Sequence, residues 1–207
     1  MQDESDANLQ AAVKALKAGD VIVFPTETLY GLGADALNDD AVSTVFRLKG
    51  RDPNIPIPVL IADETMLSLL VDQVPPLAQR LIQNFWPGPL TLVLTAREGI
   101  PKPLLNPAGG VGLRISSQPL AARLVRGLGR PLTATSANPS GKPPARTLGE
   151  AKNYFNGDVR VFIDGGPLTS KTGSTVAEVQ GDHLRIIRHG EVDRATLENL
   201  IGEGKLL

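Results

Sequence analysis

Cations and small hydroxyl side chains stand at the ends of several apolar segments of this sequence, where they could bind an anionic ligand. The stretch FPTETLYGLG completes one apolar run and offers the hydroxyls of Thr26, Thr28 and Tyr30. The stretches VGLRI and IIRHG place Arg114 and Arg188 directly after apolar residues. A buried arginine needs a partner, and guanidinium and hydroxyl donors suit carboxylate and phosphate groups. The pattern therefore predicts a site for a ligand that carries such groups.

Three loops could add donors of the same kind. KGRDPNIPIP holds Lys49 and Arg51, TSANPSGK holds Ser136 and Asn138, and TGSTV holds Ser174. Each loop taken singly is typical of a solvated turn, and the first also ends a helix at its glycine. Taken jointly, cations with hydroxyl and amide donors favour positioning and charge neutralisation over nucleophilic catalysis.

Other site chemistries find little support in the residues. There is no G-x-x-x-x-G-K-[ST] loop, and GLGADA lacks the third glycine of a dinucleotide fingerprint, although Gly31 and Gly33 could let the backbone approach a ligand. The fragments SAN and KTG occur in penicillin-binding enzymes, but no serine here has the lysine three residues later that their nucleophile requires. With no cysteine and only His183 and His189, a structural zinc site is not expected.

The elements that must position these residues alternate between strands and helices. Strands are expected at residues 20–25, 58–62, 90–95, 111–115, 131–136, 159–164, 174–179 and 183–188. Helices are expected to begin at Ser5 or Asp6, Asn38, Asp63, Pro75, Gln118, Thr147 and Asp193. Two neighbouring pairs of strands have no helix between them, which argues for a mixed sheet covered by helices on both faces.

The composition is that of an ordinary globular protein, expected as a single domain over residues 1–207. Of the 207 residues, 42% are hydrophobic and 21% charged, and the formal net charge is −1. A nucleic-acid role would therefore need a local basic patch. The lack of cysteine, the acidic start MQDESDANLQ, which is no signal peptide, and the short apolar runs predict a cytoplasmic protein without membrane contact.

At these motifs the sequence resembles the YrdC-type threonylcarbamoyl-AMP synthases, in their single-domain form. The segments that carry the resemblance stand in the family's order: VIVFPTETLYGLGADA, RLKGR, WPGPLTLVL, VGLRI, TSANPSGKPP, DGGPLTSKTGSTV and IIRHG. They cover roughly residues 8–195. The resemblance implies a three-layer mixed α/β fold, with a twisted parallel and antiparallel sheet, helices on both faces and a basic cleft.

The resemblance also implies a reaction. Family members join L-threonine, bicarbonate and ATP into threonylcarbamoyl-AMP and release pyrophosphate, the first step of a tRNA modification that a downstream threonylcarbamoyl-transferase system completes. Whether tRNA binds directly stays open. Mg²⁺ is expected to accompany ATP, held by phosphate oxygens and water and not by protein ligands. Glu27 is the nearest candidate for a metal-side or general-base role, but an exposed turn carboxylate is the favoured interpretation.

Site residues carry over by position in the motifs. Lys49 and Arg51 are implied as the catalytic pair that meets the ATP phosphates. The residues implied to complete the ATP site are Asn138, Arg146 and Arg188. The residues implied to hold threonine are Thr28, Arg114, Ser136 and Ser174, with Arg114 on its carboxylate. The chain departs from the family pattern at Asp52, Ile55, Leu60, Ser116, Gln118 and His189. Of the two orientations open to Asp52, away from the phosphates or toward their magnesium, the first is favoured because an acid facing phosphate would oppose binding.

Two competing functions can be weighed against this one. The first is an RNA-binding module that uses the same basic cleft without catalysis, helped by Arg123, Arg126 and Arg130. Only 4% of residues are aromatic, which leaves few platforms for stacking bases, and three arginines at this spacing more often form one solvated helix face. The second is a carbamoyl-transfer domain of hydrogenase-maturation proteins, but the acylphosphatase-like and zinc-finger parts of those larger chains have no counterpart here.

Overall fold

The computed structural model describes the backbone of residues 2–207 and the side chains from Asp6 onward. The helices are α1 (Gln2–Lys17), α2 (Asp39–Lys49), α3 (Pro76–Phe85), α4 (Pro119–Leu128), α5 (Leu148–Phe155) and α6 (Arg194–Ile201), with 3-10 helices η1 (Glu64–Leu69) and η2 (Lys102–Leu104). The strands are β1 (Ile22–Pro25), β2 (Tyr30–Gly33), β3 (Val59–Leu60), β4 (Leu90–Thr95), β5 (Gly110–Arg114), β6 (Leu132–Thr133), β7 (Thr135–Ser136), β8 (Val161–Phe162), β9 (Thr175–Gln180) and β10 (His183–Arg188). Within this described part, no helix is long and apolar enough to cross a membrane.

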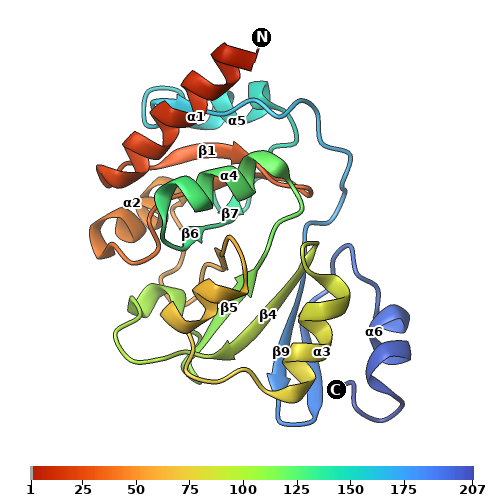
Figure 1. Ribbon diagram of the computed structural model, residues 1–207. Helices are drawn as coiled ribbons and strands as arrows, with labels where there is room; N and C mark the ends of the chain where they lie inside the picture. Colours follow the sequence, from red (N-terminus) through yellow and green to blue (C-terminus); the bar gives the residue numbers. More distant parts are fainter. Residues whose placement is uncertain (1) are drawn as a thin grey trace.

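The strands form two mixed sheets, where the sequence predicted one. The first has the order β7-β2-β1-β8 and the second the order β10-β9-β4-β5-β3-β6. Strand β1 is antiparallel to β2 and parallel to β8, and β4 is antiparallel to β5 and parallel to β9. Figure 1 shows the first sheet with α1 and α5 in the upper half of the molecule, and the second sheet with α3 and α6 in the lower half. The predicted mixed α/β class is therefore confirmed, with the strands divided between two sheets.

One short segment joins the two sheets. Residues 131–136 were expected as a single strand, but the structure divides them at Ala134. On one side of this point β6 pairs with β3 in the six-stranded sheet, and on the other β7 pairs with β2 in the four-stranded sheet. The chain therefore crosses from one sheet to the other just before Ser136, and this residue lies where the sheets meet.

Helices α1 and α4 pack together over one face of β1. Leu16, Leu124 and Phe24 from these three elements are fully buried in one apolar cluster. A Cβ atom added to Gly33 would lie 2.7 Å from the ring of Phe24, so this glycine is required for packing. Of the two glycines that the sequence associated with a ligand, Gly31 lines the cleft described below and Gly33 serves the core.

The predicted helix boundaries are mostly confirmed because they depend on local side chains. Asn38 caps α2 by accepting from the backbone N–H groups of Asp40 and Ala41, and Gly50 ends it in the left-handed region at φ 56°. Asp63 and Asp193 cap their helices as predicted. The first predicted helix is present, but its predicted start at Ser5 or Asp6 was wrong, since α1 begins at Gln2. The carboxylate of Asp6 binds Arg123 on α4 at 2.5 Å and caps no helix.

Candidate active site

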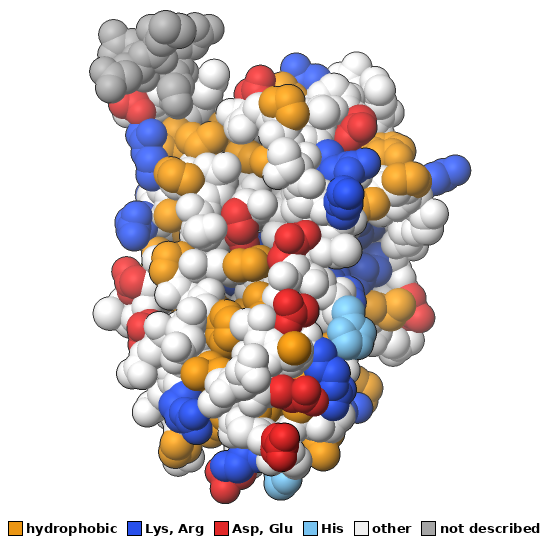
Figure 2. Space-filling model, turned by 90° about the vertical axis from the view of Figure 1, so that its right-hand side faces the viewer, with side chains coloured by type: hydrophobic (Ala, Val, Ile, Leu, Met, Phe, Trp, Pro, Cys, Tyr) orange, Lys and Arg blue, Asp and Glu red, His pale blue; other side chains and the backbone are white. Residues whose placement is uncertain are grey.

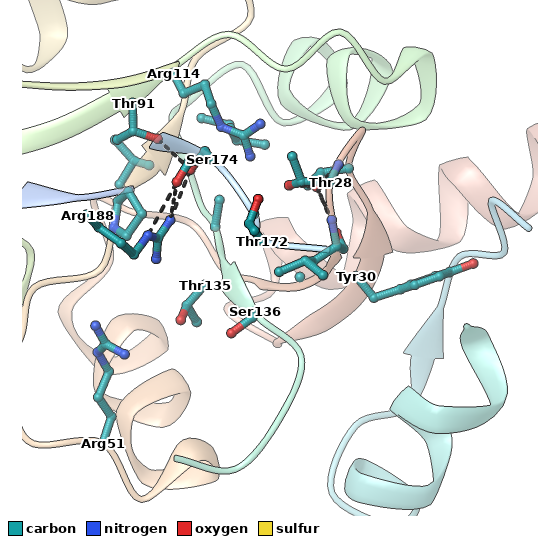
Figure 3. A pocket seen from close by; sticks show the side chains of 18 residues that line it. Thr28, Tyr30, Arg51, Thr91, Arg114, Thr135, Ser136, Thr172, Ser174 and Arg188 are labelled. Carbon is teal, nitrogen blue, oxygen red and sulfur yellow. Dashed lines mark hydrogen bonds between the residues drawn. The ribbon is translucent and has the colours of Figure 1, made fainter. Parts of the chain in front are cut away.

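A cleft opens where the strand ends of the two sheets face each other. The β1–β2 turn and β7 wall it on the side of the four-stranded sheet. Strand β3, the ends of β5 and β10, and the loop at residues 172–174 wall it on the other side. The hollow measures about 670 Å³, including open solvent at its mouth. Strand ends of two sheets thus bring together side chains that lie far apart in the sequence, as Figure 3 shows.

Three arginines line this cleft, as the sequence motifs predicted. They are Arg51 after α2, Arg114 at the end of β5, and Arg188 at the end of β10. Partial burial and then the positive charges of Arg114 and Arg51 lower the pKa of Arg188 below its ordinary value. Three guanidinium groups around one space repel one another, so binding of an anion there would be favoured.

Ser174 connects Arg188 to the strands beneath it. Nη2 of Arg188 donates to the carbonyl oxygen of Ser174 at 2.8 Å and to its hydroxyl oxygen at 3.1 Å. That hydroxyl lies 3.0 Å from the hydroxyl of Thr91 in β4. Thr91, Thr135 and Thr172 also line the cleft, although the sequence did not single them out. The one available signal was a polar Thr91 inside the otherwise apolar run LTLVL.

Glu27 is the main correction to the sequence-based site. It was favoured as an exposed turn carboxylate, but its side chain is only 15% exposed and forms an ion pair with the buried Arg114. Its second carboxylate oxygen accepts a hydrogen bond from the hydroxyl of Ser116. The burial has a clear reason, because a buried arginine requires a counter-charge. This contact explains the serine at position 116, where the chain departs from the family pattern, because its hydroxyl can donate to Glu27.

Lys49 lies behind the wall of the cleft, where it is 3% exposed. Its ammonium donates to the carbonyl oxygens of Ser136 at 2.5 Å and Asn138 at 2.7 Å. Burial, and then the charge of Arg51, lowers the pKa of Lys49 to about 7. The amide nitrogen of Asn138 donates to the carbonyl oxygens of Pro139 and Lys142, so it too is engaged within the loop. The structure therefore places Lys49 and Asn138 as supports of the loop, and places Ser136 in the cleft.

Arg51 both lines the cleft and holds its own loop. Its Nε donates to the carbonyl oxygen of Ile55 at 2.8 Å and its Nη2 to that of Pro56 at 3.1 Å. Asp52 turns back onto the same loop, where one carboxylate oxygen accepts from the backbone and side-chain nitrogens of Asn54, both at 2.9 Å. The loop is thus fixed by its own side chains, and the favoured orientation of Asp52, away from the cleft, agrees with these contacts.

Of three further residues that the sequence singled out, Thr28 has its side chain in the cleft, whereas the side chains of Arg146 and Tyr30 lie elsewhere. Arg146 is exposed and stands outside the lining of the cleft. Thr28 lines the cleft, with its hydroxyl 3.0 Å from that of Thr26. The ring of Tyr30 points away from the cleft in Figure 3, and its hydroxyl meets Asp164 and Gly166 instead.

The other residues at which the chain departs from the family pattern lie in different parts of the structure. Leu60 in β3 lines the cleft, Gln118 caps α4, and His189 is exposed. Ile55 is 50% exposed and lies, with Ile187, along an apolar groove that adjoins the cleft at Arg51. None of these residues adds a charge to the cleft, whose lining has Arg51, Arg114 and Arg188 as its charged side chains.

The arginines near α4 do not extend the positive cleft. Arg123 pairs with Asp6, and Arg130 pairs with Asp35 at 2.7 Å. On the face drawn in Figure 2, Lys and Arg side chains are interspersed with Asp and Glu. Two of the three arginines that the RNA-binding alternative named are thus engaged in ion pairs, and the third, Arg126, is exposed.

Metal ligands are scarce in the part of the chain that the structure describes. No group of three or more His, Cys, Asp or Glu residues there could hold an ion. Guanidinium and hydroxyl groups dominate the cleft, and these suit the anionic end of a ligand better than a bare cation.

A comparison with protein families decides to which family this chain belongs. The model for Sua5, YciO and YrdC proteins, described as "Telomere recombination", matches residues 14–190. The chain belongs to the Sua5/YciO/YrdC family. The resemblance that the sequence motifs carried is confirmed by this match.

Relatives of the Sua5/YciO/YrdC family extend the comparison. The threonylcarbamoyl-AMP synthase of Bacillus subtilis is 37% identical over 96% of this chain and 58% of its own length. P. abyssi Sua5 complexed with L-threonine has a TM-score of 0.91 and 35% identity, covering 96% of this chain and 58% of Sua5. E. coli YciO has a TM-score of 0.82 and 28% identity, covering 91% of this chain and 92% of YciO. The chain therefore spans less than three fifths of the first two relatives and most of YciO.

Proposed function

We propose that this protein is an L-threonylcarbamoyladenylate synthase, which converts L-threonine, bicarbonate and ATP to threonylcarbamoyl-AMP and pyrophosphate. The observation that carries the proposal is the cleft itself, in which Arg51, Arg114 and Arg188 meet hydroxyl groups from both sheets. A substrate with one carboxylate and a second with three phosphates supplies the negative charge that this arrangement lacks. The relatives named as threonylcarbamoyl-AMP synthases, and the threonine complex of Sua5, support the same reading.

Threonine would bind at the deep end of the cleft. Arg114 is 5% exposed and would take the carboxylate of threonine, because a buried guanidinium binds a carboxylate through two parallel N–H donors. The hydroxyls of Thr28, Ser136 and Ser174 lie in the same lining and would receive its amine and hydroxyl groups. This arrangement would select a small polar amino acid by hydrogen bonds.

ATP would bind with its phosphates at Arg51 and Arg188. The family motifs imply Lys49 and Asn138 as phosphate contacts. In this proposal they would act indirectly, by shaping the loop that presents Ser136. Arg146 stays a prediction for the nucleotide, and it would have to reach the ligand from an exposed position. Mg²⁺ would accompany the triphosphate on phosphate oxygens and water, and would neutralise part of their charge.

The chemistry needs little from the protein beyond position and charge. The amine of threonine combines with bicarbonate to give an N-carboxylate, with loss of water. An oxygen of this carboxylate attacks the α-phosphorus of ATP, the bond to the β-phosphate oxygen breaks, and pyrophosphate leaves. Arginines held around the phosphates stabilise the charge that develops on the leaving group. The substrate supplies its own nucleophile, which agrees with a cleft lined by donors.

The product would serve a second enzyme system. Threonylcarbamoyl-AMP is a reactive mixed anhydride, so a threonylcarbamoyl-transferase complex must consume it, with tRNA as the final acceptor. The proposed role therefore belongs to the cytoplasm and to tRNA modification. Direct binding of tRNA to this chain is a separate hypothesis, and a titration of tRNA binding against salt concentration tests it.

An omission assay tests the proposed function. Release of pyrophosphate from ATP is measured with the complete mixture and with threonine or bicarbonate left out in turn. The proposal expects release only in the complete mixture. Release that proceeds equally without threonine or without bicarbonate would show a different reaction.

A further inference from the structure

A buried ion pair joins the two sheets at the back of the cleft. Glu27 lies in the turn between β1 and β2 of the four-stranded sheet, and Arg114 ends β5 of the six-stranded sheet. Oxygen Oε1 of Glu27 accepts a hydrogen bond from Nη1 of Arg114, and Oε2 accepts one from the hydroxyl of Ser116. Both oxygens are therefore held by residues that lie 87 and 89 positions further along the chain.

Arg114 stands between Glu27 and the cleft. Its side chain is 6% exposed and lines the cleft, whereas Glu27 and Ser116 lie outside the lining. A guanidinium has five N–H donors in a rigid plane, and Glu27 engages one of its nitrogens, Nη1. Because the fork is rigid, fixing one edge also fixes the direction of the donors on the other edge.

We infer that Glu27 and Ser116 are positioning residues for the carboxylate of the amino-acid substrate, which they serve by orienting Arg114 toward the cleft. The inference rests on the proposed function, in which Arg114 receives that carboxylate. Ser116 sets the rotation of the Glu27 carboxylate, and Glu27 sets the plane of the guanidinium.

The same contacts also tie two walls of the threonine site together. Thr28 follows Glu27 directly in the chain, so the ion pair holds the turn that carries Thr28 against the end of β5. The hydroxyl of Ser116 also accepts from the backbone N–H of Gln118, the cap of α4, at 3.2 Å. The carboxylate therefore connects the turn, the end of β5 and the start of α4. A role confined to stability would lower the melting temperature without weakening threonine binding selectively.

The first test replaces Glu27 by its neutral isostere. Glu27→Gln should raise the dissociation constant of L-threonine, measured by calorimetric titration, at least tenfold. The KM for ATP should stay within about twofold, because the donors of Arg51 and Arg188 do not depend on Glu27. Glu98→Gln, which neutralises an exposed carboxylate between β4 and η2, is the matched control and should behave as the wild type.

A second pair of variants keeps the test valid if Glu27→Gln does not fold. Ser116→Thr and Ser116→Val introduce side chains of nearly the same shape, and only threonine keeps the hydroxyl. Ser116→Thr should bind L-threonine within about twofold of wild type, and Ser116→Val should bind it three- to tenfold more weakly. Equal binding by the two variants would overturn the inference for Ser116. It would also show that the Ser116 hydroxyl is not what orients Glu27.

The outcomes separate this inference from the proposed function. If the wild-type protein itself fails to bind L-threonine, the proposed function is wrong. If wild type binds L-threonine and folded Glu27→Gln binds it equally well, the function stands and the positioning role is wrong. A folded Glu27→Gln variant that loses threonine and ATP binding to the same degree would also contradict the positioning role, because it would show general damage to the cleft.

Discussion

The ammonium of Lys49 donates a hydrogen bond of 2.5 Å to the carbonyl oxygen of Ser136, which lies 87 positions further along the chain. A backbone hydrogen bond joins the same two segments, since the N–H of Ser140 donates to the carbonyl oxygen of Lys49 at 2.7 Å. The end of α2 and the loop after β7 are thus joined from both directions. The sequence motif assigns Lys49 to phosphate, but in the structure its ammonium holds the loop that places Ser136 in the cleft.

Removing the ammonium of Lys49 should weaken the fold as well as the reaction. Lys49→Met keeps the length of the side chain but leaves the carbonyl oxygens of Ser136 and Asn138 without their donor, which costs about 1–3 kcal/mol for a buried polar group. Urea unfolding should therefore show a lower free energy of unfolding, together with reduced activity. Lys142→Met, which removes an exposed cation from the same loop, is the control. Unchanged stability with a raised KM for ATP would instead indicate a direct phosphate contact.

The depressed pKa of Lys49 predicts a pH dependence of stability. The folded-state pKa is about 7 and the ordinary value is 10.5, so between these pH values the unfolded chain binds more protons than the folded chain. The contribution of Lys49 to the free energy of unfolding should therefore rise with pH across this window, by at most about 1.4 kcal/mol per pH unit, and stay constant below it. A neutral amine still offers two N–H donors to the two carbonyl oxygens.

Urea titrations between pH 7 and 9 measure this dependence. The free energy of unfolding of the wild type should rise more steeply with pH than that of Lys49→Met. Parallel pH profiles for the two proteins would show that Lys49 keeps an ordinary pKa in the folded state.

Arg51 should tolerate replacement by lysine poorly, although the charge is kept. Its planar fork reaches the carbonyl oxygens of Ile55 and Pro56 while it lines the cleft, and a lysine ammonium cannot span the same points. Arg51→Lys should raise the KM for ATP about tenfold, equivalent to about 1.4 kcal/mol, with little change in melting temperature. Arg47→Lys, an exposed change on α2, the helix that precedes Arg51, serves as the reference. Wild-type kinetics for Arg51→Lys would mean that charge alone is sufficient there.

Tyr30 should matter for stability and not for substrates. Its hydroxyl donates to the carbonyl oxygen of Gly166 at 2.9 Å and accepts from the N–H of Gly165 at 3.0 Å. Tyr30→Phe should lower the free energy of unfolding by about 1–3 kcal/mol and leave both KM values within twofold. The chain's other tyrosine gives the control, Tyr154→Phe, which should change neither property. A raised KM at full stability would place the Tyr30 hydroxyl on a ligand.

The sequence predicted best what depends on neighbours along the chain. The caps Asn38 and Asp63 follow from side chains within three residues of the N–H groups that they serve, and the stop at Gly50 follows from the left-handed backbone that glycine adopts readily. The three cleft arginines were also predicted, because each follows an apolar strand or helix that fixes where it emerges. The resemblance to the family implied one basic cleft, and all three arginines line one cleft in the structure.

The sequence predicted least what depends on distant partners. The division at Ala134 follows from pairing with β2 and β3, which no local signal records. A carboxylate in a turn and a lysine at a helix end are ordinarily solvated, so the burial of Glu27 and Lys49 could not be expected. Both are buried because partners nearly ninety positions away complete their hydrogen bonds.

Formation of the adenylate is the most direct test of the central claim. The protein is incubated with ATP, Mg²⁺, bicarbonate and isotope-labelled L-threonine, and the products are followed by mass spectrometry. We expect a labelled threonylcarbamoyl-AMP that appears with the wild type and is lost with Arg114→Met. Turnover of ATP without any labelled adenylate would contradict the proposed function.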